Sequence, residues 1–404
     1  MMYNKIIHSC LAKQLRCNMK TLIKNAKIVT NDSVLDGASL VYEDGIISYV
    51  GYDEKTADEI IDAEGSYLVP GFVDIHCHGC LGLAFNGASL DDVKTIADYH
   101  LSRGTTTMLA TTSTSDMGEI EEAMQAIEEH LKTEKKTAIV GIFMEGPWLS
   151  PAQSGAQATV YMLTPDVNQL RALKKKYPSI MRIGASPELE GGAEFGRAGR
   201  EMGLVMSVTH SDANFEETEK ALYDGYNLMT HLYSGMKGTE RKNAYRIAGA
   251  VEAGLYLDDM YVEIIADGKH LPYELLKYIY KFKGADKICL ITDAIRAAGL
   301  PNGSTTTGVS KISKALVIVE DDVGKMADRK AFAGSTATTD RLYRTMADAI
   351  GRDMVALSKM ASLTPARVMG FSDRGEIAVG KRADLVMLDD NLNLQKVILK
   401  GDVV

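Results

Sequence analysis

The segment Val73-Asp74-Ile75-His76-Cys77-His78-Gly79 places two imidazoles two residues apart at the end of an apolar run. Side chains alternate between the faces of a strand, so Asp74, His76 and His78 are expected to share one face and Val73, Ile75 and Cys77 the other. Two imidazoles placed in this way can bind one metal ion together. Five of the eight histidines follow apolar runs of this kind: His76, His78, His210, His231 and His270. The pattern indicates a metal site built from the ends of several strands.

Two carboxylates follow similar apolar runs, Glu145 before Gly-Pro and Asp293 before an alanine. A charged group at the end of a buried strand needs a partner. Glu145 can complete a metal site or bridge two metals, and Asp293 can accept a proton from a metal-bound water and return it to a leaving group. Singly, each histidine is more often a satisfied polar group, and an aspartate after a strand is often a helix cap. Together these groups favour a site for zinc or iron(II).

Eight apolar runs, each followed by a more polar and often helical segment, are expected to position these side chains. The strands are predicted to end near 74–78, 105–111, 139–145, 183–186, 205–210, 228–231, 262–267 and 288–293. Repeated strand–helix units predict an α/β fold of the (β/α)₈ TIM-barrel type, in which the strand ends converge on one mouth. An open doubly wound sheet is the rival, but no Gly-x-Gly-x-x-Gly follows an early strand.

The two ends of the chain have a different pattern, of short strands separated by turns. Neither end is long enough to bury a core alone, so residues 21–69 and 374–404 are predicted to form one small β-sandwich domain. Residues 70–373 are then the catalytic barrel, interrupted at 308–334 by an inserted hairpin. Residues 1–20 are interpreted as an N-terminal extension, either an upstream start or a disordered tail.

The bulk composition excludes several classes of partner. The net charge of −9 argues against nucleic acid or an anionic membrane as a partner. No run of about 18 apolar residues is present, so no membrane span is expected. Five cysteines, an odd number without regular spacing, predict reduced thiols and a cytoplasmic location. Cys77-x-x-Cys80 could be half of a zinc knuckle, but no second pair exists, and two ordinary thiols are the preferred interpretation.

Several motifs together resemble the amidohydrolase superfamily and, within it, the N-acetylglucosamine-6-phosphate deacetylases. His-x-His after a strand is a weak signal alone, but Glu-Gly-Pro, Asp-Gly-x-His and Ala-Gly-Ser together are specific for the deacetylase branch. The resemblance covers residues 21–404, and its motifs lie at 70–79, 145–151, 208–211, 230–233, 265–270, 292–294 and 333–335.

The resemblance implies a role for each motif residue. Glu145, His210 and His231 would bind the metal that the family holds most consistently. His76 and His78, absent from some members, would hold a second ion shared through Glu145 and Asp293. Asp293 would be the catalytic base and acid. One or two divalent ions are implied, zinc first, with iron, manganese or cobalt as alternatives. Substrate contacts would come from Gln157, Ser234, Gly235, Lys242, Arg246, His270, Phe332, Ala333 and Gly334.

The sequence departs from the family pattern at three places. Gln157 stands where the family usually has a histidine that polarises the acetamide carbonyl; its amide can still donate a hydrogen bond, but it is neutral. Ser234-Gly235 replaces Asn-Ala. The phosphate-binding arginine, which the family supplies from a neighbouring subunit, has no clean counterpart. Lys242 and Arg246, with Arg241 beside them, are the candidates, and a solvated basic loop is the alternative.

The resemblance implies metal-dependent deacetylation of N-acetyl-D-glucosamine 6-phosphate in amino-sugar catabolism, by a homodimer acting on this small molecule. An N-acetylgalactosamine-6-phosphate or a non-phosphorylated N-acyl substrate is the nearest rival. A purine or cytosine deaminase, which uses a related site, is disfavoured by the Glu-Gly-Pro motif and by the insertion at 308–334. A non-catalytic barrel is the alternative from another class, but such proteins typically lose metal ligands, and all six are present here.

Overall fold

The computed structural model describes residues 19–308 and 315–404. The predicted N-terminal extension lies outside these residues up to position 18, and part of the predicted inserted hairpin does so at 309–314. Among the described helices, none combines the length and the apolar character that crossing a bilayer requires.

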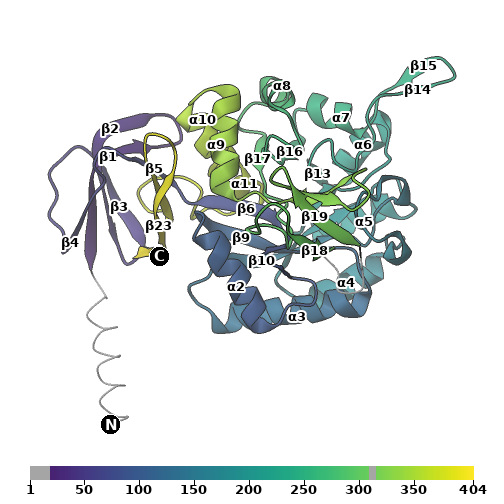
Figure 1. The fold of residues 1–404 in the computed structure, drawn as a ribbon, viewed down its shortest axis with the longest axis horizontal. Coiled ribbons are helices and arrows are strands. Elements are labelled where there is room, and N and C mark those ends of the chain that lie inside the picture. The colour runs from purple at the N-terminus through teal and green to yellow at the C-terminus, as the bar shows by residue number, and fades with distance from the viewer. Residues whose placement is uncertain (1–18, 309–314) are drawn as a thin grey trace, which may run out of the picture.

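Eight parallel strands form the centre of the larger part of the molecule (Figure 1). Their order in the sheet is β17-β16-β13-β12-β11-β10-β9-β6. The strands are β6 (Phe72–Cys77), β9 (Thr105–Thr112), β10 (Ile139–Glu145), β11 (Ile180–Ala185), β12 (Val205–Val208), β13 (Tyr226–Met229), β16 (Tyr261–Ile264) and β17 (Ile288–Leu290). Nearly every residue of these strands is buried, as expected for parallel strands covered on both faces.

Helices alternate with these strands along the chain. They are α2 (Leu90–Leu101), α3 (Met117–Thr133), α4 (Val167–Lys176), α5 (Gly192–Glu201), α6 (Phe215–Tyr223), α7 (Ala250–Tyr256), α8 (Tyr273–Lys283) and α9 (Thr339–Ile350), followed by α10 (Met354–Ser358), a π-helical turn (Lys359–Leu363) and α11 (Thr364–Val368). Several begin at side-chain caps; Ser89, for example, caps α2 in a capping box with Asp92.

The first and last strands of the sheet come together and close the barrel. The backbone N–H of Asp293, just after β17, donates to the His76 carbonyl of β6 at 2.9 Å, and the N–H of His78 donates to the Ala294 carbonyl at 2.8 Å. A barrel without free edges results, and the predicted (β/α)₈ fold is confirmed.

Strand β6 is less regular than its sequence suggests. Its pairing with β9 shifts in register between Asp74 and Cys77. Val73 and Ile75 pack in one core cluster with residues of α11, whereas Cys77 packs in the large cluster with residues of α2 and α3. The predicted strict alternation, with Val73, Ile75 and Cys77 on one face, is therefore interrupted by a local irregularity of the kind that re-aims side chains next to active sites.

The two chain ends form one mixed sheet beside the barrel (Figure 1). Its path is β24-β23-β22-β5-β1-β2-β3, with β4 beside β1. The sheet curls, because Ile46 at the start of β3 bridges to Arg382, and it encloses its own apolar cluster. The strands are β1 (Lys20–Val29), β2 (Val34–Glu43), β3 (Ile46–Gly51), β4 (Glu59–Asp62), β5 (Tyr67–Pro70), β22 (Leu385–Leu388), β23 (Leu394–Leu399) and β24 (Asp402–Val403). We propose domain boundaries at about 70 and 373, where the chain passes between this sheet and the barrel.

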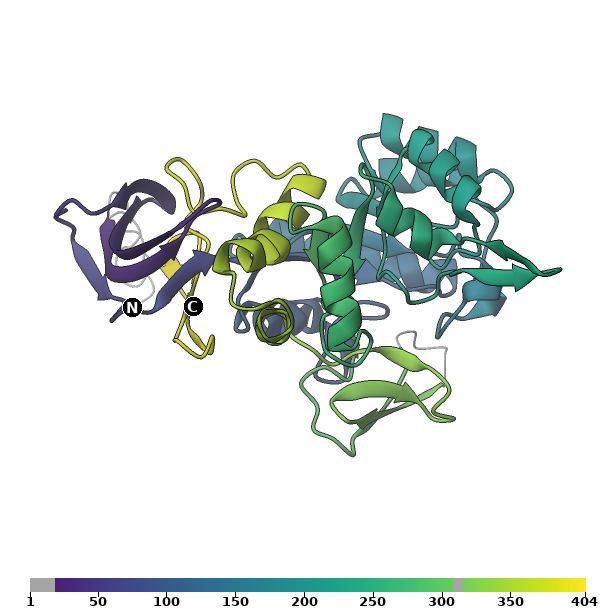
Figure 2. The same ribbon diagram turned by 90° about the horizontal axis from the view of Figure 1, so that it is seen from above.

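Two smaller β-structures leave the barrel. The insertion is a four-stranded antiparallel sheet of β18 (Thr305–Thr307), β19 (Leu316–Glu320), β20 (Val323–Met326) and β21 (Phe332–Ser335), larger than the predicted hairpin. The hairpin of β14 (Glu240–Lys242) and β15 (Tyr245–Ile247) projects away from the barrel in both views (Figures 1 and 2). Short strands β7 (Gly79–Cys80) and β8 (Leu83–Ala84) follow β6.

Candidate active site

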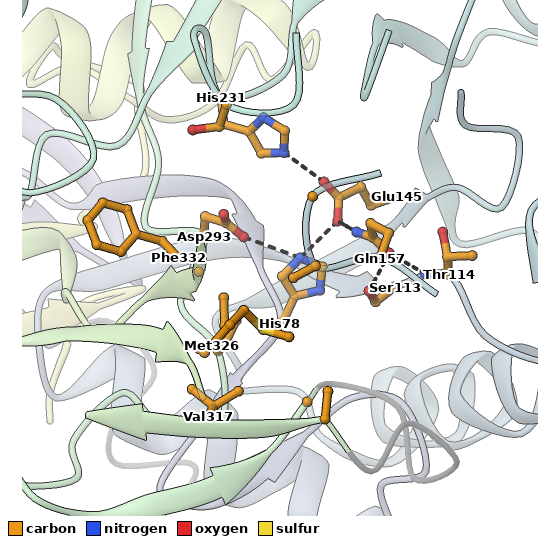
Figure 3. A pocket seen from close by; sticks show the side chains of 18 of the residues that line it. His78, Ser113, Thr114, Glu145, Gln157, His231, Asp293, Val317, Met326 and Phe332 are labelled. Atoms are coloured by element: carbon orange, nitrogen blue, oxygen red, sulfur yellow. Dashed lines mark hydrogen bonds and ion pairs between the residues drawn. The ribbon is translucent and has the colours of Figure 1, made fainter. Parts of the chain in front are cut away.

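The structure brings the six predicted metal-site residues together at the barrel mouth. His76 lies in β6 and Glu145 is the last residue of β10. His78 directly follows β6, and the other three lie two or three residues beyond the ends of β12, β13 and β17: His210, His231 and Asp293. Figure 3 shows several of these side chains pointing toward one another from different strands. All are buried except Asp293, whose side chain is 13% exposed.

The Glu145 carboxylate lies at the centre of the four imidazoles. Its oxygens are 2.9 Å from His231 Nε2, 3.2 Å from His78 Nε2, 3.4 Å from His210 Nε2 and 3.7 Å from His76 Nε2. Asp293 Oδ1 lies 3.4 Å from His76 Nε2 and 3.3 Å from His78 Nε2. The Nε2 atom of every imidazole therefore faces Glu145, and those of His76 and His78 also face Asp293.

This donor set fits one or two divalent ions. Two groups have ligand atoms that all lie within 4.8 Å of one another: His76, His78 and Glu145 form one, and Glu145, His210 and His231 form the other. His76 Nε2 and His78 Nε2 are only 3.1 Å apart, and two neutral lone pairs would repel at that distance. A cation between them, or a proton on one of them, removes the conflict. Nitrogen and carboxylate ligands suit zinc, iron, manganese and cobalt alike.

Three of the six residues have a backbone conformation that non-glycine residues rarely adopt. The φ angle is +45° at His210, +32° at His231 and +45° at Asp293. Such left-handed residues cost free energy and concentrate at functional sites. Each one turns the chain sharply at a strand end and keeps the side chain directed into the barrel mouth.

The outer ring nitrogens of the imidazoles have different partners. His78 Nδ1 donates to the Thr111 carbonyl at 3.2 Å, and His210 Nδ1 donates to the Gln153 carbonyl at 2.7 Å. His76 Nδ1 instead faces a carboxylate, Glu263 Oε2, at 3.4 Å. Histidines that bind metal typically donate their second ring N–H to a carbonyl or carboxylate, which directs the other nitrogen at the ion.

Charge is balanced inside the cluster. Burial alone would raise the pKa of the Glu145 carboxyl, but the imidazoles around it, His76 foremost and then His210, His231 and His78, hold this pKa well below its usual range. Burial would lower the pKa of His78, but its contacts with Asp293 and Glu145 raise this pKa to about 10. Without a metal, the cluster therefore compensates its carboxylates with protons on imidazole.

Gln157 lies beside this cluster in one fixed orientation (Figure 3). Its Oε1 accepts hydrogen bonds from Ser113 Oγ at 2.9 Å and from the Thr114 backbone N–H at 3.0 Å. The amide nitrogen therefore faces the site, where it donates to Glu145 Oε2 at 2.6 Å. A primary amide has two N–H groups, so one remains for a ligand.

A cavity of about 200 Å³ opens next to the cluster. His270 forms part of its wall, held by a 2.8 Å hydrogen bond from Nδ1 to Asp267 Oδ2, and its ring lies 4.8 Å from the Phe332 ring. Val317 and Met326 of the inserted sheet form an apolar side of the cavity (Figure 3). Among the described residues, the remaining lining comes mainly from Ser113, Thr114, Gln157, Ser234, Ile295, Ala333 and Gly334, with no lysine or arginine.

Three of the predicted substrate-binding residues lie elsewhere. Lys242 and Arg246 are exposed, and they lie on the projecting β14–β15 hairpin rather than in the cavity of the same chain. Gly235 packs against the back of His210: a Cβ there would lie 2.3 Å from His210 Nδ1, and its φ is +57°. Its backbone conformation and this close approach both require glycine at position 235.

Sequence reasoning missed residues inside the barrel and along the cavity wall. Arg182 and Glu263 are fully buried in strands β11 and β16 and pair with each other. Each is a charged residue inside an otherwise apolar strand, and this feature of the sequence could have pointed to them. Ser113 and Thr114 follow β9 as polar residues in a Thr-Thr-Ser-Thr run that contains no distinctive motif.

Comparison with known proteins places this chain in a family. The model of the amidohydrolase family matches residues 67–404. The chain belongs to this family. As an amidohydrolase it is 30% identical to the N-acetylglucosamine-6-phosphate deacetylase of Bacillus subtilis, over 95% of this chain and 96% of that protein. It is 28% identical to the N-acetylgalactosamine-6-phosphate deacetylase of Escherichia coli O157:H7, over 95% and 99%.

A solved structure shows the same relationship in three dimensions. A mutant N-acetyl-D-glucosamine-6-phosphate deacetylase from Mycobacterium smegmatis, in complex with N-acetyl-D-glucosamine-6-phosphate, superposes with a TM-score of 0.86 at 28% identity. The match covers 95% of this chain and 99% of that one. The predicted membership of the amidohydrolase superfamily is confirmed.

Proposed function

We propose that this protein hydrolyses N-acetyl-D-glucosamine 6-phosphate to D-glucosamine 6-phosphate and acetate, a step of amino-sugar catabolism. The observation that carries the proposal is the convergence of four imidazoles and two carboxylates beside a cavity, in a chain that matches deacetylases along nearly its whole length. The reaction breaks the amide C–N bond of the acetamide with one water molecule.

Glu145, His210 and His231 would hold one divalent ion, for which zinc is the first candidate. His76 and His78 would hold a second ion, with Glu145 shared and Asp293 adjacent to both imidazoles. When bound, such an ion polarises a carbonyl and lowers the pKa of water toward about 7. The convergence of the Nε2 atoms on Glu145 supports this assignment.

Asp293 is the proposed base and acid of the reaction. Its carboxylate is the most accessible of the six groups, and contacts with His76 and His78 keep its pKa low although burial would raise it. An ionised carboxylate can accept the proton of the attacking water and then deliver it to the amine as the C–N bond breaks. Gln157 would donate its free N–H to the acetamide oxygen as negative charge develops there.

The sugar would lie in the cavity between the barrel mouth and the inserted sheet. His270, oriented by Asp267, would present Nε2 to a hydroxyl group, and Ser234, which also lines the cavity, would contact the sugar. The backbone of Ala333 and Gly334 and the ring of Phe332 would line the pocket, as the cavity wall supports.

The phosphate would be bound across a homodimer. The described cavity lining holds no lysine or arginine. The β14–β15 hairpin carries Arg241, Lys242 and Arg246, is exposed and projects from the barrel. In a dimer this hairpin would reach the cavity of the second copy, and Lys242 or Arg246 would contact the phosphate there.

A cytoplasmic location is also proposed. The cysteines in the described part of the chain, Cys77, Cys80 and Cys289, are free and buried. Buried thiols that form no disulfide are typical of proteins in reducing compartments.

A substrate panel tests this function. The zinc-loaded protein is expected to release acetate from N-acetylglucosamine 6-phosphate with a kcat/KM at least tenfold above that for unphosphorylated N-acetylglucosamine. N-acetylgalactosamine 6-phosphate is the second candidate, because the Escherichia coli relative with that name matches the chain over 95% of its length. Turnover of unphosphorylated compounds alone would reject the proposed phosphate site.

A further inference from the structure

An ion pair is enclosed inside the barrel directly behind the proposed metal ligands. Arg182 of β11 and Glu263 of β16 are both fully buried and form a two-pronged contact, Nη1 with Oε1 and Nη2 with Oε2. Replacing such a pair by apolar residues of similar volume is often neutral or stabilising in proteins. Fold stability alone therefore gives little reason for two charges at this position.

The guanidinium is held in place from every side. Arg182 donates to the Thr230 hydroxyl at 2.8 Å, to the Ile75 carbonyl at 3.1 Å and to Ser207 Oγ at 3.2 Å. Its plane lies over the Phe143 ring, 3.8 Å from the ring centre. Arginine stays protonated in proteins, so the carboxylate paired with it stays ionised and can only accept hydrogen bonds.

The Glu263 carboxylate also faces one imidazole of the proposed metal site. Its Oε2 lies 3.4 Å from His76 Nδ1, and Phe143 also contacts the His76 ring edge-on, with centroids 4.9 Å apart. Because an ionised carboxylate only accepts, this contact fixes a proton on His76 Nδ1. The lone pair of Nε2 is then directed toward Glu145 and Asp293.

Only one of the two ligand groups has this support. His78 and His210 donate to neutral backbone carbonyls, and His231 Nδ1 has no hydrogen-bond partner among the described residues. Glu263 contacts His76, which belongs to the group with His78, and it contacts neither His210 nor His231 through any described hydrogen bond or ion pair.

We propose that Glu263, held by Arg182, is a positioning residue that sets the tautomer and orientation of His76 and so controls binding of the second metal ion selectively. This inference rests on the proposed function, because it assumes that both ligand groups bind metal. Outer partners of metal-bound histidines typically contribute 10–100-fold to metal affinity. Removal of Glu263 is therefore expected to lower the affinity for one zinc equivalent by at least about tenfold and to leave the affinity for the other nearly unchanged.

Zinc titration of the demetallated full-length protein tests this selectivity. Competition with a chromophoric chelator gives two affinities in the wild type, and His78→Ala identifies the equivalent that belongs to the His76 group. Glu263→Gln should weaken that equivalent by about tenfold or more. Because a single substitution leaves the Arg182 charge without a counter-charge and can impair folding, the double variant Arg182→Met/Glu263→Leu is measured beside it, and the same selective loss is expected.

Ser207→Ala is the matched control, because it removes a partner of the same guanidinium without touching Glu263 or His76. It should leave both zinc affinities within about twofold. Nitrogen chemical shifts of the metal-free protein give an independent readout: the Nδ1–H tautomer of His76 should dominate in the wild type and lose its dominance in the double variant.

Two results would overturn the inference. In the first, the Glu263 variants bind both zinc equivalents with wild-type affinity. In the second, the Glu263 variants and Ser207→Ala all bind both zinc equivalents more weakly, and to the same extent. A wild-type protein that binds no zinc, iron, manganese or cobalt would instead reject the proposed function itself. The two failures are therefore distinguishable.

Discussion

Replacing Gln157 with glutamate removes one hydrogen-bond donor from the active site while keeping the shape of the side chain. The carboxylate can still accept the bonds from Ser113 Oγ and the Thr114 N–H, which are 2.9 and 3.0 Å long in the native protein. What disappears is the amide nitrogen that now lies 2.6 Å from Glu145 Oε2, together with its second N–H. The substitution therefore removes the donor that the proposed mechanism assigns to the acetamide oxygen, and it also places a second carboxylate against Glu145, which is why zinc content is measured beside activity.

The size of the effect follows from the role of that donor. Loss of one preorganised donor to a developing oxyanion lowers kcat by about 10²–10³, or about 2.7–4 kcal/mol of transition-state stabilisation. An interaction made only in the transition state changes kcat and leaves KM nearly unchanged. Gln157→Ala should lose a similar factor in kcat and also stability, because two largely buried donors at Ser113 and Thr114 lose their acceptor, at about 1–3 kcal/mol for each.

Steady-state acetate release from N-acetylglucosamine 6-phosphate measures these effects, with zinc content determined for each variant. Gln157→His, which introduces the residue that the family usually has here, is the matched control and should retain most of the activity. A Gln157→Glu variant with full zinc content and a kcat within threefold of the wild type would refute the reasoning. So would a loss that falls entirely on KM.

Three further predictions concern other parts of the molecule. Asp293→Asn should lower kcat by about 10²–10⁴ at unchanged zinc content, measured by the same assay, because it removes the proton acceptor; activity near wild type would exclude that role. Lys242→Ala/Arg246→Ala should raise KM for the phosphorylated substrate and leave the low activity on N-acetylglucosamine unchanged; equal effects on both substrates would argue against a phosphate contact. Burial lowers the pKa of Lys283 from 10.5 to about 8. Below pH 8, keeping this lysine charged in the folded protein therefore costs at most about 3 kcal/mol of stability. This cost disappears as the pH rises to 10.5, where the lysine also loses its proton in the unfolded chain. Lys283→Met should therefore raise the free energy of unfolding measured by urea titration at pH 7, although loss of the 2.8 Å hydrogen bond to the Leu257 carbonyl makes the gain smaller. The gain should shrink between pH 8 and 10.5. A gain that stays constant over this range would contradict the buried charge as its cause.

Much of the fold could be predicted from local sequence patterns. Buried parallel strands are continuous apolar runs, and a polar residue directly after such a run lies at the barrel mouth, which is why Glu145 and Asp293 could be found without a structure. The predicted alternation of strand faces failed at Cys77. The register shift in β6 depends on its pairing with β9 and cannot be seen in the periodicity of the sequence.

Other parts of the site depend on contacts between residues distant in the sequence. Arg182 and Glu263 lie 81 positions apart, and neither has a motif around it. The left-handed conformations of His210 and His231 are imposed by the surrounding barrel and are not preferred by histidine. The β14–β15 hairpin projects away from the cavity of its own chain, which is likewise a property of the three-dimensional arrangement. Lys242 is close to His231 in the sequence, but it does not lie at the site.

Metal-dependent release of acetate from N-acetylglucosamine 6-phosphate tests the central claim most directly. The protein is demetallated with a chelator, reconstituted with increasing zinc, and assayed at each metal content with wild-type and His231→Ala protein. We expect no turnover without metal, activity that rises with the zinc equivalents bound by the wild type, and little recovery in His231→Ala. Full activity of the demetallated protein, or no acetate release at any content of zinc, iron, manganese or cobalt, would contradict the account.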